Sequence, residues 1–130
     1  MSEAQSLAEL KWKKRLVIGS VENPLFLAQL RKEISKNQIE VRERKLFFLI
    51  HSDQEWSIYG SKNAPSEAVL AEVRKRLGDA DLALIGLDGG TKERFRKEDF
   101  SLQVVFELID RMPMRREELR RESEEGRIRN

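Results

Sequence analysis

Residues 82–95 read LALIGLDGGTKERF, an apolar run followed by a glycine-rich turn and a polar segment. The run Leu82–Gly86 predicts a strand. Asp88-Gly89-Gly90-Thr91 predicts a hairpin turn, because consecutive residues with positive φ are least costly when they are Asp, Asn or Gly. Lys92–Phe95 is then a second strand that pairs with the first. An antiparallel hairpin is therefore expected in the C-terminal half of the chain.

A strand and a helix begin the part of the chain that precedes this hairpin. Leu16–Gly19 is a short apolar run, typical of a strand that is buried on both faces. Asn23 is expected to cap the following helix, and Pro24 suits its first position because no N–H is needed there. The helix ends before Arg44 and presents one apolar face: Phe26, Leu27, Leu30 and Ile34.

A second strand and helix follow. Lys45–His51 is rich in aromatic and branched residues and predicts a strand. Pro65 and Ser66 begin a helix that stops at Gly78. Between them, Ser52–Ala64 is expected to be a long loop with an edge strand, because apolar and polar residues alternate there around Trp56, Ile58 and Tyr59.

The chain closes with a third helix. Asp99 or Ser101 caps it, and Pro113 interrupts it after a continuous apolar stripe. Met114–Arg121 restarts as a charged helix, and we expect a disordered tail over residues 122–130 and a flexible lead over residues 1–10. The order βαβαββα predicts one α/β domain over residues 11–121: a thioredoxin-like, mixed four- to five-stranded sheet flanked by helices. The stripe consists of Leu102, Val105, Phe106, Ile109 and Met112.

Composition narrows the function classes. The 130 residues (15.2 kDa) carry 25 Lys and Arg against 23 Asp and Glu, interleaved along the chain, so no basic block is available for specific nucleic-acid binding. No apolar run is long enough to span a membrane, and the first twenty residues lack the continuous hydrophobic centre of a signal peptide. We expect a soluble protein, cytoplasmic as written, or periplasmic or secreted if a leader was removed.

The chain contains no cysteine. Disulfide exchange and peroxide reduction through sulfenic acid both need a sulfur nucleophile, and Met does not replace it. Thiol oxidoreductase or peroxidase activity is therefore not expected, and no residue pattern calls for a cofactor.

Three segments carry a resemblance to a known family: Trp12 with Arg15, Leu84–Gly86 running into Asp88–Gly90 and Lys92, and Ile109–Glu117 (IDRMPMRRE). Over residues 10–121 the chain resembles the bacterial thioredoxin-like domain of unknown function 4174 family of the DUDES group. That group is related to domains of sushi-repeat and coiled-coil-containing extracellular proteins. The resemblance implies a thioredoxin-like fold, export of many members and, by fold analogy, peroxiredoxin-like activity. Fold analogy alone does not establish a reaction.

The sequence departs from a redox centre where a thioredoxin has one. At the junction of the first strand and first helix it has Ser20-Val21-Glu22-Asn23, and a serine without an adjacent base is a poor nucleophile. Gly78–Asp81 stands where thioredoxins have a proline. Ser20 and Asn23 lie at a helix start, where they either bind an anion or cap the helix, and capping is favoured.

Two other candidates have simpler interpretations. His51, Asp53 and Glu55 have the spacing of ligands on one strand face, but a lone His among loop carboxylates is usually solvated, so no metal site is predicted. Trp12 lies among lysines and is expected to pack against the core while its basic neighbours face solvent.

Met112–Arg116 is the strongest candidate for a binding site. Met112 and Met114 supply adaptable thioethers, and Arg115 and Arg116 supply guanidinium groups that hold carboxylates or phosphates. The competing interpretation is structural: Met112 continues the apolar stripe, and the arginines pair with Asp110 or nearby glutamates.

The sequence favours a non-catalytic binding or interaction module, with another protein as the partner. Two alternatives stay open. One is a thiol-independent enzyme that uses Ser20, Asp88 or the two arginines. The other is weak binding of polyanions through Lys11–Arg15 and Arg115–Arg121.

Overall fold

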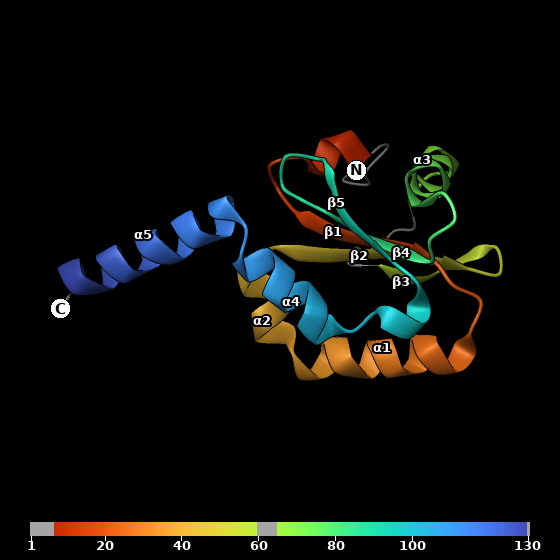
Figure 1. Ribbon diagram of the computed structural model, residues 1–130, viewed down its shortest axis with the longest axis horizontal. Coiled ribbons are helices and arrows are strands. Elements are labelled where there is room, and N and C mark those ends of the chain that lie inside the picture. Colours follow the sequence, from red (N-terminus) through yellow and green to blue (C-terminus); the bar gives the residue numbers. More distant parts are fainter. Residues whose placement is uncertain (1–6, 60–64, 130) are drawn as a thin grey trace.

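The computed structural model describes residues 7–59 and 65–129. A single mixed sheet runs through the middle of the molecule, with helices on both faces (Figure 1). The elements are η1 (Leu7–Leu10), β1 (Arg15–Ser20), α1 (Pro24–Lys36), α2 (Gln38–Glu43), β2 (Leu46–Ser52), β3 (Glu55–Tyr59), α3 (Glu67–Leu77), β4 (Leu82–Ile85), β5 (Thr91–Phe95), η2 (Lys97–Asp99), α4 (Leu102–Asp110) and α5 (Pro113–Arg129).

The sheet has five strands in the order β3-β2-β1-β4-β5. β1 and β2 are parallel and joined through helices, whereas β2–β3, β1–β4 and β4–β5 are antiparallel. The parallel crossover from β1 to β2 and the antiparallel β4–β5 hairpin are as expected from the sequence, whereas β4, after the second crossover, runs antiparallel to β1. The prediction of a mixed α/β domain with four to five strands is confirmed. The strand order is compatible with a thioredoxin-like fold.

The two faces of the sheet bury two separate cores, because neighbouring side chains on a strand point to opposite faces. Val17, Leu82 and Leu84 face α1 and α4. Leu16, Ile18 and Ile85 face α3 and η1. In Figure 1, α1 and α4 lie below the sheet and α3 above it. This layered arrangement explains why Leu16–Ile18 in β1 and all of β4 are apolar.

Capping residues set the helix starts. The Asn23 side chain accepts hydrogen bonds from the N–H groups of Leu25 and Phe26, so Asn23 is the predicted cap of α1. Ser66 and Ser101 accept from Val69 and Val104 in the same way. Of the two predicted caps for α4, the structure therefore uses Ser101.

One predicted helix is in fact two. The helix expected from Pro24 to before Arg44 breaks at Asn37, whose φ and ψ are −121° and 34°. The Asn37 side chain donates to the Glu33 carbonyl at 2.8 Å, competing with the backbone bonds of the helix. The break turns the chain, and α2 begins in a new direction (Figure 1).

Consecutive positive φ angles occur in the β2–β3 turn and not in the β4–β5 turn, for which they were expected. In the β4–β5 turn only Gly89 has a positive φ, 84°, so the expected run of positive φ angles is wrong there. Asp53 and Gln54, between β2 and β3, have φ of 48° and 68° instead. Two consecutive positive φ angles match the twist of a tight hairpin even without glycine.

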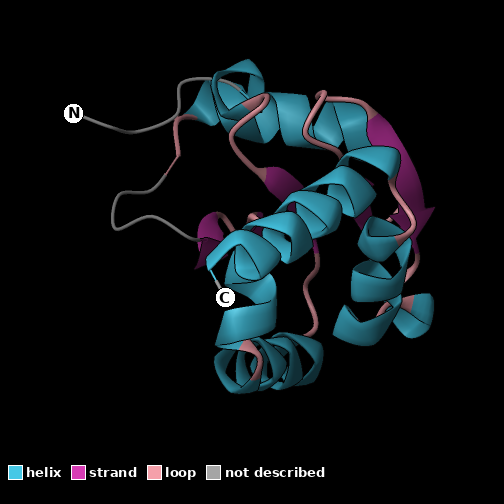
Figure 2. Ribbon diagram, turned by 90° about the vertical axis from the view of Figure 1, so that its left-hand side faces the viewer, coloured by secondary structure: helices cyan, strands magenta, loops and turns pink. Residues whose placement is uncertain are grey.

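The predicted domain limits, residues 11–121, stay a prediction. Of the expected flexible lead, residues 1–6 lie outside the described residues, and Leu7–Leu10 forms η1 with Leu7 buried. Of the tail expected over residues 122–130, Asn130 lies outside the described residues, and residues 122–129 belong to α5. Figure 1 shows α5 extending away from the sheet and the other helices, and in Figure 2, seen from that side, its C-terminal end lies in front of them. Among the described residues there is no helix with the length and hydropathy of a bilayer span.

Candidate functional site

The candidate site lies at the end of the sheet where β1 begins and β4 ends. These two ends meet because β1 and β4 are antiparallel, with Leu16 opposite Ile85. A hydrogen bond of 2.6 Å from the Trp12 N–H to the Leu87 carbonyl fixes the two loops to each other. The junction of α4 and α5 covers the same end of the sheet, so three segments far apart in the sequence converge there.

These segments enclose a cavity of about 320 Å³, which we call the junction cavity. Its volume is near the lower end of the range for small-molecule sites, about 300–1,000 Å³. Most of the wall is apolar, and the charged groups come from β1 and the hairpin. The lining residues are Arg15, Gly86, Leu87, Asp88, Lys92, Met112, Pro113 and Met114.

The β4–β5 hairpin holds its charged residues in place through its glycines. Asp88 accepts from the Gly90 N–H at 2.9 Å and pairs with the Lys92 ammonium at 2.9 Å. The Gly90 bond and, next, Lys92 lower the pKa of Asp88, which keeps the carboxylate ionised. Lys92 lies directly across Gly86: a Cβ there would come within 2.5 Å of Lys92 Cε. A glycine at position 86 therefore lets Lys92 lie against the cavity.

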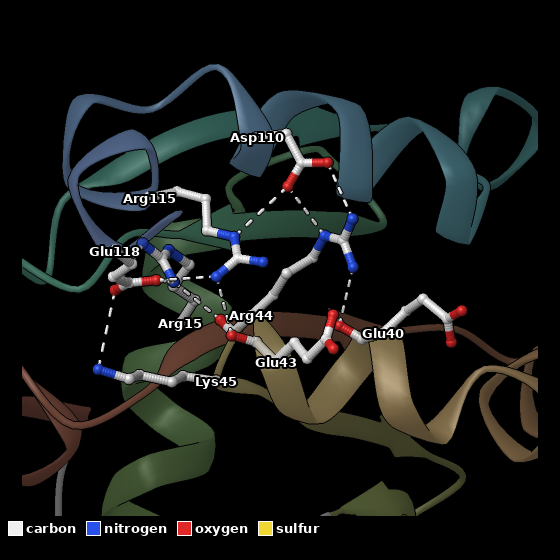
Figure 3. A network of polar contacts seen from close by, with 8 residues as sticks. All are labelled: Arg15, Glu40, Glu43, Arg44, Lys45, Asp110, Arg115 and Glu118. Carbon is white, nitrogen blue, oxygen red and sulfur yellow. Dashed lines mark hydrogen bonds and ion pairs between the residues drawn. The ribbon is translucent and has the colours of Figure 1, made fainter. Parts of the chain in front are cut away.

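A network of arginines lies beside the cavity (Figure 3). Arg15 is only 1% exposed. Its Nη1 donates to the Arg44 carbonyl at 2.9 Å, and its Nη1 and Nη2 both reach the Glu118 carboxylate at 3.4 Å. Glu118 comes from α5, so this contact joins the start of β1 to a helix that begins almost 100 residues later.

Arg115 is the second buried arginine, 3% exposed. It donates to the Glu43 carbonyl at 3.2 Å and to Glu118 at 3.3 Å, and its Nε lies 3.6 Å from Asp110. Arg44 holds the same Asp110 with two hydrogen bonds of 3.0 and 2.8 Å. Burial raises the pKa of Asp110, but the bonds and charges of Arg44 and Arg115 outweigh it, and the pKa is lowered.

The arginines also satisfy the end of α2. The carbonyls of Glu40, Glu43 and Arg44 accept from Arg44, Arg115 and Arg15, respectively. Carbonyls at a helix C-terminus lack partners within the helix, and cations are favourable near them. The network therefore fixes α2, β1 and α5 to one another and supports the cavity wall.

The structure separates the six predicted site residues. Met112 and Met114 line the junction cavity, and Met114 is 39% exposed. Arg115 is buried in the network, where its partners include Asp110, one of the partners expected from the sequence. Arg116 is exposed on α5. Ser20 and Asn23 lie at the opposite end of β1.

The hollow at Ser20 and Asn23 is wider, about 600 Å³, but offers little to a ligand. Asn23 already accepts from two N–H groups at the start of α1, as the capping interpretation predicts. The charged residues that line the hollow are Glu22, Asp81 and Lys97. The Asp81 carboxylate accepts from the Lys97 N–H at 2.8 Å. The two acids disfavour an anion here.

Trp12 differs from the expectation. It is 59% exposed, so the prediction that it packs against the core is wrong. Its φ of 69° is unusual for a residue with a side chain, and its bond to Leu87 holds it there. The Lys11 ammonium lies 5.7 Å from the ring centroid. The backbone of Trp12 is therefore bonded to the hairpin that forms one wall of the cavity, and its ring is exposed.

His51 is buried, 5% exposed, and packs edge-on against Trp56 with ring centroids 5.0 Å apart. Asp53 and Glu55 are exposed. In residues 7–59 and 65–129, His, Asp and Glu side chains do not gather in a group of three that could hold a metal. Burial and, next, the charge of Arg74 lower the pKa of His51, against Glu22 and a bond to the Gln54 backbone, which raise it.

This shift predicts a pH dependence of stability. The unfolded chain takes up a proton on His51 near pH 6.5, and the folded protein does so only at lower pH. The free energy of unfolding should therefore fall as pH drops from 7.5 to 5.5. His51 is the only histidine, so urea titrations of His51→Gln should show a flatter dependence over this window. An equal slope in the variant would contradict the assignment.

Sequence reasoning missed Arg15, Arg44 and Glu118 as members of the site. Arg15 follows four basic or aromatic residues and looks solvated, and only the folded chain shows that it is buried. A signal was present nevertheless: seven of the eight residues lining the cavity fall within the three segments that carry the family resemblance.

Comparison with known proteins supports one family. The model of the family described as Domain of unknown function (DUF4174) matches residues 6–118. Comparisons with curated proteins and with solved structures gave no match.

Proposed function

The chain belongs to the DUF4174 family of domains of unknown function, and we propose that this member is a non-catalytic binding module whose recognition site is the junction cavity. One observation carries the proposal: β1, the β4–β5 hairpin and the start of α5 come together around a cavity with apolar walls and charged edges. The proposed partner is another protein. The thioredoxin-like fold and the relation to the DUDES group belong to the same proposal.

The walls of the cavity suit recognition. Met112 and Met114 are flexible and polarisable, so they adapt to apolar groups of different shapes. Pro113 begins α5 and gives the wall a fixed turn. Lys92 and Asp88 are both partly exposed at 38% and 43% of their side chains, so they are available at the edge of the cavity. An apolar centre with a polar rim is the usual composition of a protein interface.

The same residues are poorly suited to catalysis. The cavity lining has no serine, cysteine or histidine, and its one acid, Asp88, is ionised and already bonded to Lys92 and Gly90. A general base works best with a pKa near the operating pH, which Asp88 lacks. Ser20 is five strand positions from Arg15, about 16 Å away. The groups of the alternative enzyme hypothesis therefore do not converge.

Replacing Met114 with Glu tests the proposal. A carboxylate at the cavity mouth should abolish capture of the partner from the native source, while the fold is retained, because Met114 is 39% exposed. Leu119→Glu is the matched control: Leu119 is on the same helix and 41% exposed, but does not line the cavity. Quantitative mass spectrometry of the captured proteins, with cross-links mapped onto the bait, gives the readout.

The supporting result is a protein captured by the wild type and by Leu119→Glu, lost with Met114→Glu, and cross-linked beside the cavity. Arg116→Ala should also retain it, because Arg116 lies outside the cavity lining. If every captured protein is retained by Met114→Glu, the junction cavity is not the recognition site.

A further inference from the structure

The arginine network carries more positive than negative charge. Its side-chain cations are Arg15, Arg44, Lys45 and Arg115, and its side-chain anions are Asp110 and Glu118. Glu118 is divided among three cations at 3.3–3.7 Å, distances that are long for charged hydrogen bonds. Two carboxylates therefore do not neutralise this group.

Two of the cations are buried, and each has an unused hydrogen-bond donor. Arg15 Nε and Arg115 Nε are both buried and have no hydrogen-bond partner among the described residues. A buried donor without a partner costs about 1–3 kcal/mol, so such groups are uncommon and call for an explanation. Arg115 Nε at least lies near Asp110, at 3.6 Å. Arg15 has no such second carboxylate, and Arg15 is the one of the two that lines the junction cavity.

Other features of the cavity favour an anion. Lys92 adds a second cation to the lining, and α5, a helix of 17 residues, begins there at Pro113, so the positive end of its dipole lies at the cavity. Asp88 is the one acid in the lining, and Lys92 already neutralises it. A small number of positive groups in the lining of a mostly apolar cavity suits a single negative charge attached to an apolar body.

We propose that the junction cavity binds a carboxylate with an apolar body, the carboxylate on the side of Arg15 and Lys92 and the apolar body against Met112 and Met114. This inference rests on the proposed function and names the chemistry that the cavity recognises. A singly charged carboxylate fits better than a phosphate dianion, because Lys92 is already paired with Asp88 and Arg15 is the one remaining cation of the lining. The carboxylate belongs either to a small acid or to a peptide of the partner.

Methyl NMR of the full chain labelled at methionine tests this directly, because the chain has only three methionines. Benzoate represents a small acid and N-acetylphenylalanine a peptide C-terminus. Each is titrated beside its uncharged amide at constant ionic strength. The carboxylates should shift the Met112 and Met114 signals saturably, and the amides should bind about tenfold more weakly or not at all. The tighter of the two acids identifies the source.

Lys92→Gln and Lys97→Gln form a matched pair. Both lysines are 38% exposed and each is paired with one acid, Asp88 or Glu98. Lys92→Gln should weaken carboxylate binding about fivefold or more, whereas Lys97→Gln should not change it. Neither lysine belongs to the buried network, so folding is not at issue.

The inference fails if neither acid shifts the two methionine signals, if the amides bind as well as the acids, or if the two lysine variants behave alike. These outcomes differ from failure of the proposed function. Suppose that Met114→Glu loses a partner but neither acid binds the wild type. The junction cavity would then remain the recognition site, and only the inference that it binds a carboxylate would be rejected.

Discussion

Replacing Glu118 with Gln is expected to lower the free energy of unfolding by about 3–5 kcal/mol, the usual cost of removing one partner from a buried ion pair. Glu118 is the carboxylate that Arg15 and Arg115 share, and those arginines are 1% and 3% exposed. The amide keeps the shape of the side chain and removes its charge. Two buried guanidinium groups then lose their common counter-ion, and urea unfolding followed by circular dichroism measures the loss.

Glu117→Gln is the control on the neighbouring position. Glu117 pairs with Arg120 and Arg121 on the exposed side of α5. Surface pairs contribute little, so this variant should unfold at almost the same urea concentration as the wild type. If Glu118→Gln is no more destabilised than Glu117→Gln, the buried arginines do not depend on Glu118, and the charge argument for the cavity loses its foundation.

The sequence predicted the strands and helix starts well where one local preference determines the conformation. The apolar runs around Val17 and Leu84 predicted strands, the first of them buried on both faces, and both strands lie inside the sheet. Asn23 and Ser101 predicted helix starts, because short polar side chains satisfy the free N–H groups of a first turn. These are local effects, and local sequence is enough to identify them.

The sequence failed where a single side-chain or backbone contact, local or distant, decides the conformation. Nothing before Asn37 indicates that its amide bonds to Glu33 and ends α1. Trp12 was expected inside and is outside, because its backbone rather than its ring is fixed by Leu87. The alternation around Trp56 did indicate an edge strand. The tight turn before that strand was not predicted, because its residues with positive φ are Asp53 and Gln54 and not glycines.

The candidate site was predicted only in part for the same reason. Met112 and Met114 were recognised from their unusual surroundings in the sequence, and they line the cavity. Arg115 was given two interpretations, and its contacts match the structural one. Arg15 could not be identified from spacing, because burial of a guanidinium depends on carbonyls and a carboxylate supplied by α2 and α5.

Phe106→Ala is the second variant with a large expected effect, because Phe106 supports the core and the network together. The ring is 5% exposed among the residues that pack α4 against the sheet. The guanidinium carbon of Arg44 lies 4.4 Å from the ring centroid. Truncating a buried Phe to Ala costs about 3–5 kcal/mol, so the free energy of unfolding should fall by that amount.

Phe106→Leu separates the two contributions, because leucine keeps much of the apolar volume and removes the π face that Arg44 covers. Its expected loss is less than half that of Phe106→Ala. A double-mutant cycle with Arg44→Met then isolates the contact, with an expected coupling of about 0.5–2 kcal/mol. Loss of the ring should also free Arg44 from Asp110 and move the pKa of Asp110 up toward its ordinary value, which carboxyl NMR detects. Additive losses together with an unchanged Asp110 would mean that Phe106 fills the core without positioning Arg44.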